Sequence, residues 1–345
     1  MMKACILTGA GRLEVREVPL PRVEADGMLV KVCACGICGS DIRNYLSGPR
    51  LGKPEQVMGH EIAGVVADAG KNVKNFAVGD RVTVAPDVSC GECYYCRKGL
   101  GNLCLNHKMV GTHWPGGYAQ YVYLDNDILS RGMVLRMPDA LDFYAATLAE
   151  PLSSVVAAQE YNNVSLGDTV VVIGDGPIGC FHLQIARTRG ARTIMVGLTR
   201  LDTAALFDPD HIIDAGAQDP VEEVLKLTGG LGADVAITAN SVAKTHAQAV
   251  EMVRKRGRVI LFGGLPRDKS QTCFDGNKVH YGEISVVGAF SYTSDVNQKA
   301  VEYLSRGLIS TDRLINRIVT LDEVQDVIEA ARNGEVLKAV IDPWK

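Results

Sequence analysis

Short hydrophobic runs separated by turn residues fill the first part of the chain. Runs at 29–34, 63–68 and 79–86 are rich in valine and lie close to Gly, Asp or Pro. Runs of this length and composition predict β-strands. Helical periodicity is scarce before residues 141–160. We therefore expect the first 150 or so residues to be β-rich.

From residue 154 to residue 288, hydrophobic runs alternate with stretches of helical periodicity. The runs expected to form strands lie at 169–173, 193–196, 235–238, 258–262 and 284–287. This alternation is typical of α/β proteins with a doubly wound parallel sheet, the Rossmann arrangement. Helical patterns follow at 296–305 and 321–333, and a strand-like run at 338–341 closes the chain.

The order of these regions predicts two domains, one of them discontinuous. A length of 345 residues suits about two domains. Because a β-rich part precedes the parallel sheet, we expect the C-terminal tail to return to that part. The predicted boundaries are 1–153 with 289–345 for the β-rich domain, and 154–288 for the inserted Rossmann domain.

The strand expected at 169–173 leads directly into the pattern Gly174-x-Gly176-x-x-Gly179, and a helical pattern follows. This strand–turn–helix context is the one that the dinucleotide fingerprint requires, with the phosphates at the helix N-terminus. Plain βα turns also use glycines in this way, but both flanks favour a nucleotide. The residues expected to contact it here are Gly174, Gly176, Pro177, Ile178 and Gly179.

Composition and charge exclude several classes of function. The chain is 47% hydrophobic and 22% charged, with a formal net charge of −4, so we expect no nucleic-acid or membrane partner. It shows no apolar leader and no membrane-length apolar run. Ten cysteines in such a chain favour metal binding or free thiols over a disulfide framework. We expect a cytoplasmic protein.

Four cysteines form the strongest local motif. Cys90, Cys93, Cys96 and Cys104 share a short glycine-containing loop. Four thiolates can close a tetrahedral shell around Zn²⁺ and leave no open position, as in structural zinc sites. An iron–sulfur cluster is the alternative, but the bacterial ferredoxin run ends with a three-residue spacing and Pro, whereas here the spacing is seven residues and Leu105 follows. We predict a structural zinc lobe over about 88–106.

A second group of possible zinc ligands is dispersed along the sequence. Cys38, the pair His60-Glu61 and Glu150 offer a thiolate, an imidazole and carboxylates. Three protein ligands plus water would leave the open position that catalysis needs. By spacing alone, such residues coincide by chance in many enzymes.

Taken together, these motifs resemble the zinc-dependent medium-chain dehydrogenases of the alcohol dehydrogenase superfamily. The motifs that carry the resemblance are the turn 36–41, the triplet 59–61, the four-cysteine lobe, the triplet 150–152 and the glycine fingerprint. They occur in the family's order and cover essentially the whole chain. The polyol (sorbitol-like) and threonine dehydrogenase branch is most similar, because position 150 is Glu where another branch has Cys.

The resemblance implies a chaperonin-10 (GroES)-like catalytic domain beside the Rossmann domain, with the active site in the cleft between them. It also implies two zinc ions per chain, NAD(P) as cofactor, and a homotetramer or homodimer. Cys38, His60 and Glu150 would hold the catalytic zinc, with Glu61 as a neighbouring or exchanging ligand. Asp41 would orient the imidazole of His60.

The same resemblance implies how the reaction proceeds. Zinc would lower the pKa of the substrate hydroxyl, Ser40 would pass its proton toward solvent, and the carbon would give hydride to the nicotinamide. Relatives often end this relay with a His five residues after the ligand Cys, where this chain has Arg43. Because arginine stays protonated, it is a poor proton carrier; Arg43 could instead hold a cofactor phosphate or an anionic substrate, or be a surface residue.

The second strand of the parallel sheet bears on cofactor choice. NAD-selective domains place Asp or Glu at its end, but this chain has Gly197 there, followed by Thr199 and Arg200. A missing carboxylate removes repulsion against a 2′-phosphate, and the later side chains supply donors. We predict NADP over NAD. Two further turns resemble passages beside the nicotinamide, and their residues are Phe262, Gly263, Ala289 and Phe290.

We therefore predict an enzyme that transfers hydride between NAD(P) and a secondary alcohol of a polyol, sugar or sugar phosphate, or the corresponding ketone. A threonine-type amino alcohol is the alternative substrate. The competing class is a non-catalytic NADPH-binding protein or a quinone reductase on the same scaffold, neither of which needs an open metal site.

Overall fold

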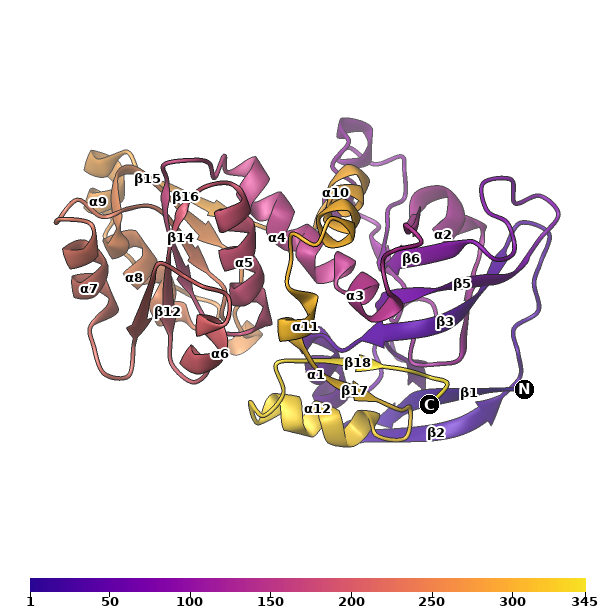
Figure 1. Ribbon diagram of the computed structural model, residues 1–345. Helices are drawn as coiled ribbons and strands as arrows, with labels where there is room; N and C mark the ends of the chain where they lie inside the picture. Colours follow the sequence, from indigo (N-terminus) through magenta and orange to yellow (C-terminus); the bar gives the residue numbers. More distant parts are fainter. The chain divides into compact units, whose positions relative to one another are not determined.

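The computed structural model describes residues 1–345, which form two compact units. The first unit comprises Met1–Ser153, Tyr292–Gly307 and Thr311–Lys345, and the second comprises Ser154–Ser291 and Leu308–Ser310. Figure 1 shows the first unit drawn from both ends of the colour scale, because the C-terminal segment returns to the N-terminal one. None of the helices combines the length and the apolar character that crossing a bilayer needs.

Two β-sheets make up most of the first unit. A three-stranded sheet has the order β2 (Arg12–Val18), β1 (Met2–Gly9), β4 (Gln56–Val57). The larger sheet has the order β10 (Met133–Arg136), β6 (Arg81–Ala85), β5 (Glu61–Ala69), β3 (Met28–Gly36), β18 (Lys338–Ile341), β17 (Ile315–Val319), with β9 (Tyr121–Leu124) also paired to β3. The strands predicted at 29–34, 63–68, 79–86 and 338–341 are therefore confirmed.

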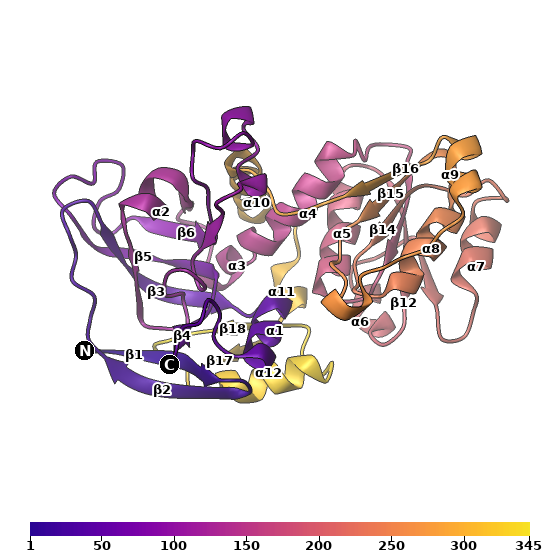
Figure 2. The ribbon, with the colours of Figure 1, turned by 180° about the vertical axis from the view of Figure 1, so that it is seen from behind.

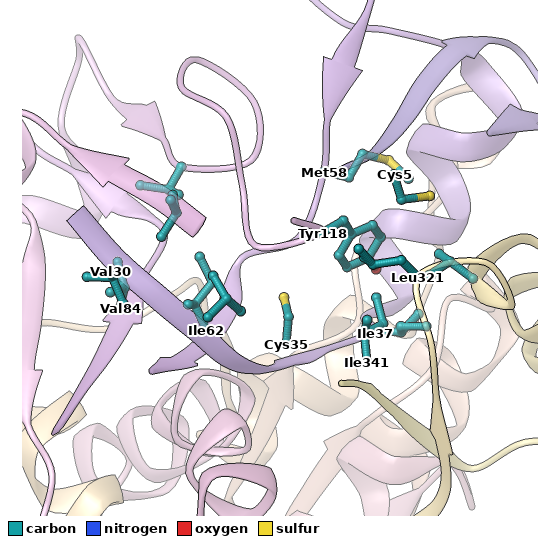
Figure 3. Packing of buried hydrophobic residues seen from close by; sticks show 14 of the residues in the cluster. Cys5, Val30, Cys35, Ile37, Met58, Ile62, Val84, Tyr118, Leu321 and Ile341 are labelled. Atoms are coloured by element: carbon teal, nitrogen blue, oxygen red, sulfur yellow. The ribbon is translucent and has the colours of Figure 1, made fainter. Parts of the chain in front are cut away.

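The last strand joins the two ends of the chain. β18 pairs antiparallel with β3, with Val340 opposite Gly36 and Ile341 opposite Cys35. Alternate residues of β3 and β5 enter a shared core with Tyr118, which is fully buried. Figure 3 shows part of this core. The pairing places the start of β18 beside the turn that follows β3.

Short helices border these sheets. They are α1 (Gly39–Ser47), α2 (Asn126–Arg131), α3 (Phe143–Thr147), α10 (Ser294–Ser305), α11 (Thr311–Leu314) and α12 (Val324–Arg332), and the small pair β7 (Asp87–Val88) and β8 (Lys108–Met109) flanks the cysteine lobe. The helical pattern predicted over 141–160 is divided between α3 and α4 (Ala149–Tyr161). The division has a physical reason, because Pro151 has no N–H and its ring would clash with the carbonyl of Thr147 in one continuous helix.

The second unit is a six-stranded sheet in which every pair is parallel. Its order is β13 (His211–Asp214), β12 (Arg192–Gly197), β11 (Thr169–Ile173), β14 (Ala233–Thr238), β15 (Val253–Leu261), β16 (Ser285–Gly288). Counted along the chain this is 3-2-1-4-5-6, the doubly wound order with its reversal between β11 and β14. The predicted α/β class with a Rossmann sheet is confirmed.

Helices lie on both faces of this sheet. They are α5 (Pro177–Thr188), α6 (Leu201–Ala205), α7 (Pro220–Leu227), α8 (Ala243–Met252) and α9 (Gly276–Gly282). Figures 1 and 2 place α5 on one face and α7 with α8 on the other. Five of the six strands match predicted runs. The strand missed was β13, whose four residues His211–Asp214 carry polar groups at both ends and half-exposed Ile212, so that no hydrophobic run marks it.

Candidate active site and cofactor site

The first group of candidate metal ligands forms where β3 turns into α1. Cys38 has an extended backbone directly before α1, and its N–H donates to Asp41 Oδ2 over 2.9 Å. Asp41 is 1% exposed, and its Oδ1 lies 3.4 Å from His60 Nδ1. Burial alone would raise the pKa of Asp41, but the neighbouring His60 holds it below its usual value. The carboxylate therefore orients the imidazole through Nδ1 and leaves Nε2 for a ligand.

Glu61, the first residue of β5, completes this group. Single ligand atoms of Cys38, His60 and Glu61 lie within 4.8 Å of one another. Glu61 is fully buried, and its Oε1 has no hydrogen-bond partner. An unpaired buried carboxylate oxygen is costly unless a cation satisfies it. The donor set and this oxygen fit a metal ion.

A buried lysine supports Glu61 and was not predicted from the sequence. Lys338 Nζ lies 2.5 Å from Glu61 Oε2 and donates to the carbonyl of Ile37 over 3.0 Å. Gly36 leaves room for this pair, because a Cβ atom there would collide with Glu61 Oε2. The sequence holds one sign of this role, because Lys338 interrupts the apolar run 336–341. A lysine buried in the core needs a partner, and here that partner is Glu61.

Glu150 lies in the first turn of α4, outside the closest group of ligand atoms. Its Oε1 accepts a hydrogen bond of 3.0 Å from the hydroxyl of Tyr292. Burial raises the pKa of Glu150 to about 7, and the charges of His60 and Glu61 also act on it. Glu150 is thus near the cluster but engaged with Tyr292, a partner that the sequence did not indicate.

Ser40 and Arg43 occupy the first two turns of α1. Ser40 Oγ lies 3.4 Å from His60 Nε2, which places the hydroxyl at the ligand side of the imidazole. Arg43 is exposed on the same helix. The structure therefore brings Ser40 and Asp41 to the cluster, as expected, and leaves Arg43 at the surface.

The four cysteines of the lobe converge. The Sγ atoms of Cys93 and Cys96 are 3.5 Å apart, those of Cys90 and Cys96 3.9 Å, and those of Cys93 and Cys104 4.0 Å. Zinc–sulfur bonds of about 2.3 Å in a tetrahedron place the sulfurs about 3.8 Å apart. Backbone N–H groups of Cys96 and Leu105 lower the pKa of Cys93 to about 6. The lobe fits a zinc ion closed off by four thiolates.

The glycine fingerprint of the second unit joins β11 to α5. Gly174 has φ +129°, and a Cβ there would lie 2.8 Å from the carbonyl of Ala239. A Cβ at Gly179 would collide with the carbonyl of Gly174, whereas Gly176 faces open space. The helix then begins at Pro177, in the position where a missing N–H costs nothing. The backbone at each glycine thus has the geometry that a pyrophosphate-binding turn requires.

The other predicted cofactor residues follow the carboxyl ends of the neighbouring parallel strands. Gly197 ends β12, Thr199 is exposed, and Arg200 Nε is buried without a hydrogen-bond partner. Asp175 was not predicted, although it lies inside the fingerprint; its carboxylate accepts hydrogen bonds from the turn after β12.

The two turns predicted beside the nicotinamide lie at the same edge of the sheet. Phe262 packs edge-on against His182 with ring centroids 4.7 Å apart, and the N–H of Gly263 donates to the carbonyl of Thr238 over 2.8 Å. Ala289 donates to the carbonyl of Leu261 over 3.1 Å, and Phe290 is 65% exposed. Backbone therefore passes close to the carboxyl ends of β14, β15 and β16, where ligands of such sheets bind.

Comparison with known proteins agrees with this geometry. The model described as "Alcohol dehydrogenase GroES-like domain" matches residues 24–139, and the model described as "Zinc-binding dehydrogenase" matches residues 177–306. Sorbitol dehydrogenase of Bacillus subtilis (strain 168) is 33% identical over 353 aligned residues, which cover 99% of this chain and 97% of that one. D-arabitol-phosphate dehydrogenase of Enterococcus avium is 31% identical, with 97% and 95% covered.

A crystal structure described as a zinc-binding dehydrogenase from Sinorhizobium meliloti 1021, bound to NADP, superposes with a TM-score of 0.92. It is 33% identical, and 99% of each chain is covered. The predicted GroES-like and Rossmann combination and the predicted resemblance are confirmed. With two family models covering most of both units, and relatives that align over nearly its full length, this chain belongs to the zinc-binding medium-chain dehydrogenases of the alcohol dehydrogenase superfamily.

Proposed function

We propose that this dehydrogenase oxidises a secondary hydroxyl of a polyol, sugar or sugar phosphate with NADP, and reduces the ketone in reverse. The observation that carries the proposal is the cluster of Cys38, His60 and Glu61, in which one buried carboxylate oxygen has no partner. Such a mixed set suits a catalytic zinc with an open position. The sorbitol and arabitol-phosphate dehydrogenases among the relatives support the substrate class.

The residues that would hold this zinc are Cys38 and His60, with Glu61 or Glu150 as the carboxylate. When bound, zinc and NADP supply a Lewis acid for the substrate oxygen and a hydride acceptor for the substrate carbon. The two carboxylates are held differently, Glu61 by Lys338 and Glu150 by Tyr292. We propose that they exchange at the metal, because each has a partner that can hold it when it is released.

The chain's own groups would position the substrate and move its proton. Ser40 Oγ lies at the ligand side of His60 and can accept the hydroxyl proton. Asp41 keeps the imidazole fixed through Nδ1. Arg43 cannot continue a relay, because its guanidinium does not release a proton near neutral pH. We therefore propose that Ser40 passes the proton directly to water.

We also propose a second zinc in the four-cysteine lobe. The convergence of the four thiols, with sulfur separations of 3.5–4.0 Å, supports it. A site closed by four thiolates would stabilise the loop and take no part in the reaction.

The preference for NADP rests on Gly197, Thr199 and Arg200. No acidic side chain extends from the end of β12, and the buried Nε of Arg200 has no hydrogen-bond acceptor. The NADP bound to the Sinorhizobium relative is consistent with this choice. A higher kcat/KM with NAD than with NADP would contradict it.

Initial rates of the zinc-loaded protein would test the proposal. NAD and NADP would each be combined with polyols, sugar acids, sugar phosphates and threonine. Cys38→Ser removes a proposed ligand, and Cys33→Ser is the matched control, since Cys33 lies in β3 outside both clusters. We expect a rate on one polyol-like compound that Cys38→Ser abolishes and Cys33→Ser keeps. A faster rate on threonine would favour the amino-alcohol alternative, and activity that survives loss of zinc would favour the quinone-reductase class.

Quaternary structure and location remain predictions. We propose a cytoplasmic homotetramer or homodimer, as the family resemblance implies. Light scattering behind size exclusion would measure the assembly, and a monomeric mass would contradict this part of the proposal.

A further inference from the structure

Asp175 lies between the first two glycines of the fingerprint, but its carboxylate reaches the end of the neighbouring strand. Its Oδ2 accepts hydrogen bonds from the backbone N–H groups of Leu198 over 2.8 Å, Thr199 over 2.8 Å and Arg200 over 2.7 Å. Asp175 is 7% exposed. Three donors on one buried oxygen fix the turn between β12 and α6 in a single conformation.

The negative charge of Asp175 is stabilised by backbone N–H groups of the protein itself. Burial alone would raise its pKa, but the N–H groups of Arg200, Leu198 and Thr199 outweigh burial and hold the pKa below its usual value. The carboxylate is therefore ionised at neutral pH, with its negative charge directed into the backbone of the turn.

This arrangement also closes position 197 to larger residues. A Cβ atom at Gly197 would lie 2.8 Å from Asp175 Oδ2 and 2.6 Å from Leu201 Cδ2. An Asp or Glu at this place reads the ribose 2′-OH in NAD-selective domains. Here it would meet the carboxylate of Asp175, both sterically and as a like charge. NAD-type recognition is therefore blocked by Asp175 as well as missing from position 197.

One donor atom of Arg200, at the end of the turn, lacks a partner. Arg200 donates its backbone N–H to Asp175, while its Nε is buried with no hydrogen bond. A buried donor without an acceptor is unfavourable, and an anionic oxygen would satisfy it. Thr199, the preceding residue, is exposed. The turn thus offers a cation and a hydroxyl for a phosphate group.

We propose that Asp175 is a positioning residue that determines cofactor choice. It excludes an acidic residue from position 197 and holds the 198–200 turn, so that Thr199 and Arg200 receive the 2′-phosphate of NADP. This inference rests on the dinucleotide site of the proposed function. It makes the two positions interdependent: an acid at 197 can confer NAD binding only after Asp175 has been removed.

The test measures dissociation constants of NADPH and NADH by calorimetry, without substrate. The variants are Asp175→Ala, Asp175→Asn, Gly197→Asp and the double variant Asp175→Ala/Gly197→Asp. We expect the native protein to bind NADPH more tightly. Asp175→Ala should weaken NADPH about tenfold, as loss of charge-assisted hydrogen bonds does, and change NADH less than about twofold. Asp175→Asn keeps one acceptor oxygen, so its affinity for NADPH should lie between those of the native protein and Asp175→Ala.

The glycine variants separate positioning from general damage to the fold. Gly197→Asp alone should weaken both dinucleotides and lower the melting temperature. Adding Asp175→Ala removes the opposing carboxylate but keeps the contacts of the new Cβ with Leu201 Cδ2 and with Cβ of residue 175. It should therefore recover part of the lost melting temperature and reverse the preference toward NADH. If a variant only lost stability, its affinities for NADPH and NADH would fall together, and the ratio of the two would stay as in the native protein.

Three results would overturn the inference. One is a native protein that binds NADH more tightly than NADPH. The second is a Gly197→Asp variant that prefers NADH while it keeps the native melting temperature. The third is a larger loss for NADH than for NADPH in Asp175→Ala, which would show that Asp175 itself contacts the ribose. The first result would also contradict the NADP preference of the proposed function, whereas the second and third would overturn the role of Asp175 alone. A native protein that binds neither dinucleotide would contradict the dinucleotide site itself, so the failures are distinguishable.

Discussion

The two candidate metal clusters of the first unit are built in opposite ways. The four thiols come from one short loop, are identical in kind, and face each other at 3.5–4.0 Å. Cys38 and the His60-Glu61 pair come from different elements, and further residues hold the latter two: Asp41 orients His60, and Lys338 pairs with Glu61. A closed set of equal ligands stabilises a loop, whereas a mixed set with supporting residues leaves an atom free for chemistry.

The largest expected effect separates the two clusters directly. Cys38→Ser should lower kcat/KM by roughly 10³-fold or more, since a Lewis acid contributes several kcal/mol to the transition state. Zinc content should fall from two ions per chain to one, with the melting temperature nearly unchanged. Initial rates and metal analysis of the same preparation measure both.

Cys93→Ser should show the reverse behaviour. Loss of the zinc proposed for the lobe should lower the free energy of unfolding by roughly 3 kcal/mol or more, because metal binding contributes to folding. The rate per remaining folded molecule should change little. Urea titration with activity measured at low denaturant checks this, and a Cys93→Ser variant that is stable but inactive would undermine the distinction.

Lys338→Met tests whether the supporting residues matter. It leaves Glu61 buried and charged without its partner, and breaking such a pair costs about 3–5 kcal/mol of unfolding free energy. The matched double variant Glu61→Gln/Lys338→Met removes both charges and should recover much of that loss. If the double variant were no more stable than Lys338→Met, the buried ion pair would not be the cause.

Asp41→Asn should have a smaller effect that is confined to the metal. The variant weakens the hold on His60 Nδ1, and such outer residues typically change metal affinity by about 10–100-fold. Competition with a chromogenic chelator measures this affinity. The four-cysteine site of the same protein serves as internal control, and its zinc should be released as in the native protein.

A further prediction, on the pH dependence of stability, contrasts two buried histidines. His60 has Asp41 beside it, whereas His182 is fully buried against Gln159 and Phe262, and burial lowers its pKa to about 3. The unfolded chain takes up this proton near pH 6.5 and the folded one only near pH 3, so stability decreases as pH falls through that interval. His182 can change the free energy of unfolding by at most about 1.4 kcal/mol per pH unit.

Unfolding free energies between pH 4 and pH 7 would measure this dependence. His182→Gln should flatten the profile, while His211→Gln, at the edge strand β13, should leave it close to native. Equal slopes in both variants would assign the acid sensitivity to other groups.

Local motifs could be predicted from the sequence, whereas ligands dispersed along the chain could not, for physical reasons. The four cysteines and the glycine fingerprint are local, so their spacing alone predicts the site. Cys38, His60 and Glu150 are far apart in the sequence, so their spacing could not predict a site, and only the family resemblance proposed them as ligands. The structure adds that Glu61, not Glu150, lies in the closest group of ligand atoms.

Lys338 and Asp175 could not be predicted because their roles depend on strand pairing. β18 returns to β3 across most of the chain's length, which brings Lys338 to Glu61. Parallel pairing of β11 with β12 brings Asp175 to the 198–200 turn. A charged residue inside an apolar run, or inside a glycine turn, is the only trace of either in the sequence.

The most direct measurement is the visible absorption spectrum of the cobalt-substituted protein during titration with the polyol that gives the highest rate. The visible spectrum of a cobalt ion depends on the atoms that coordinate it. Substrate should therefore change the spectrum only of a cobalt ion whose site has an open position. We expect a substrate-dependent change in the native protein and in Cys93→Ser, and none in Cys38→Ser. A change that persists in Cys38→Ser, or disappears only in Cys93→Ser, would contradict the assignment of Cys38, His60 and the neighbouring carboxylates as the catalytic centre.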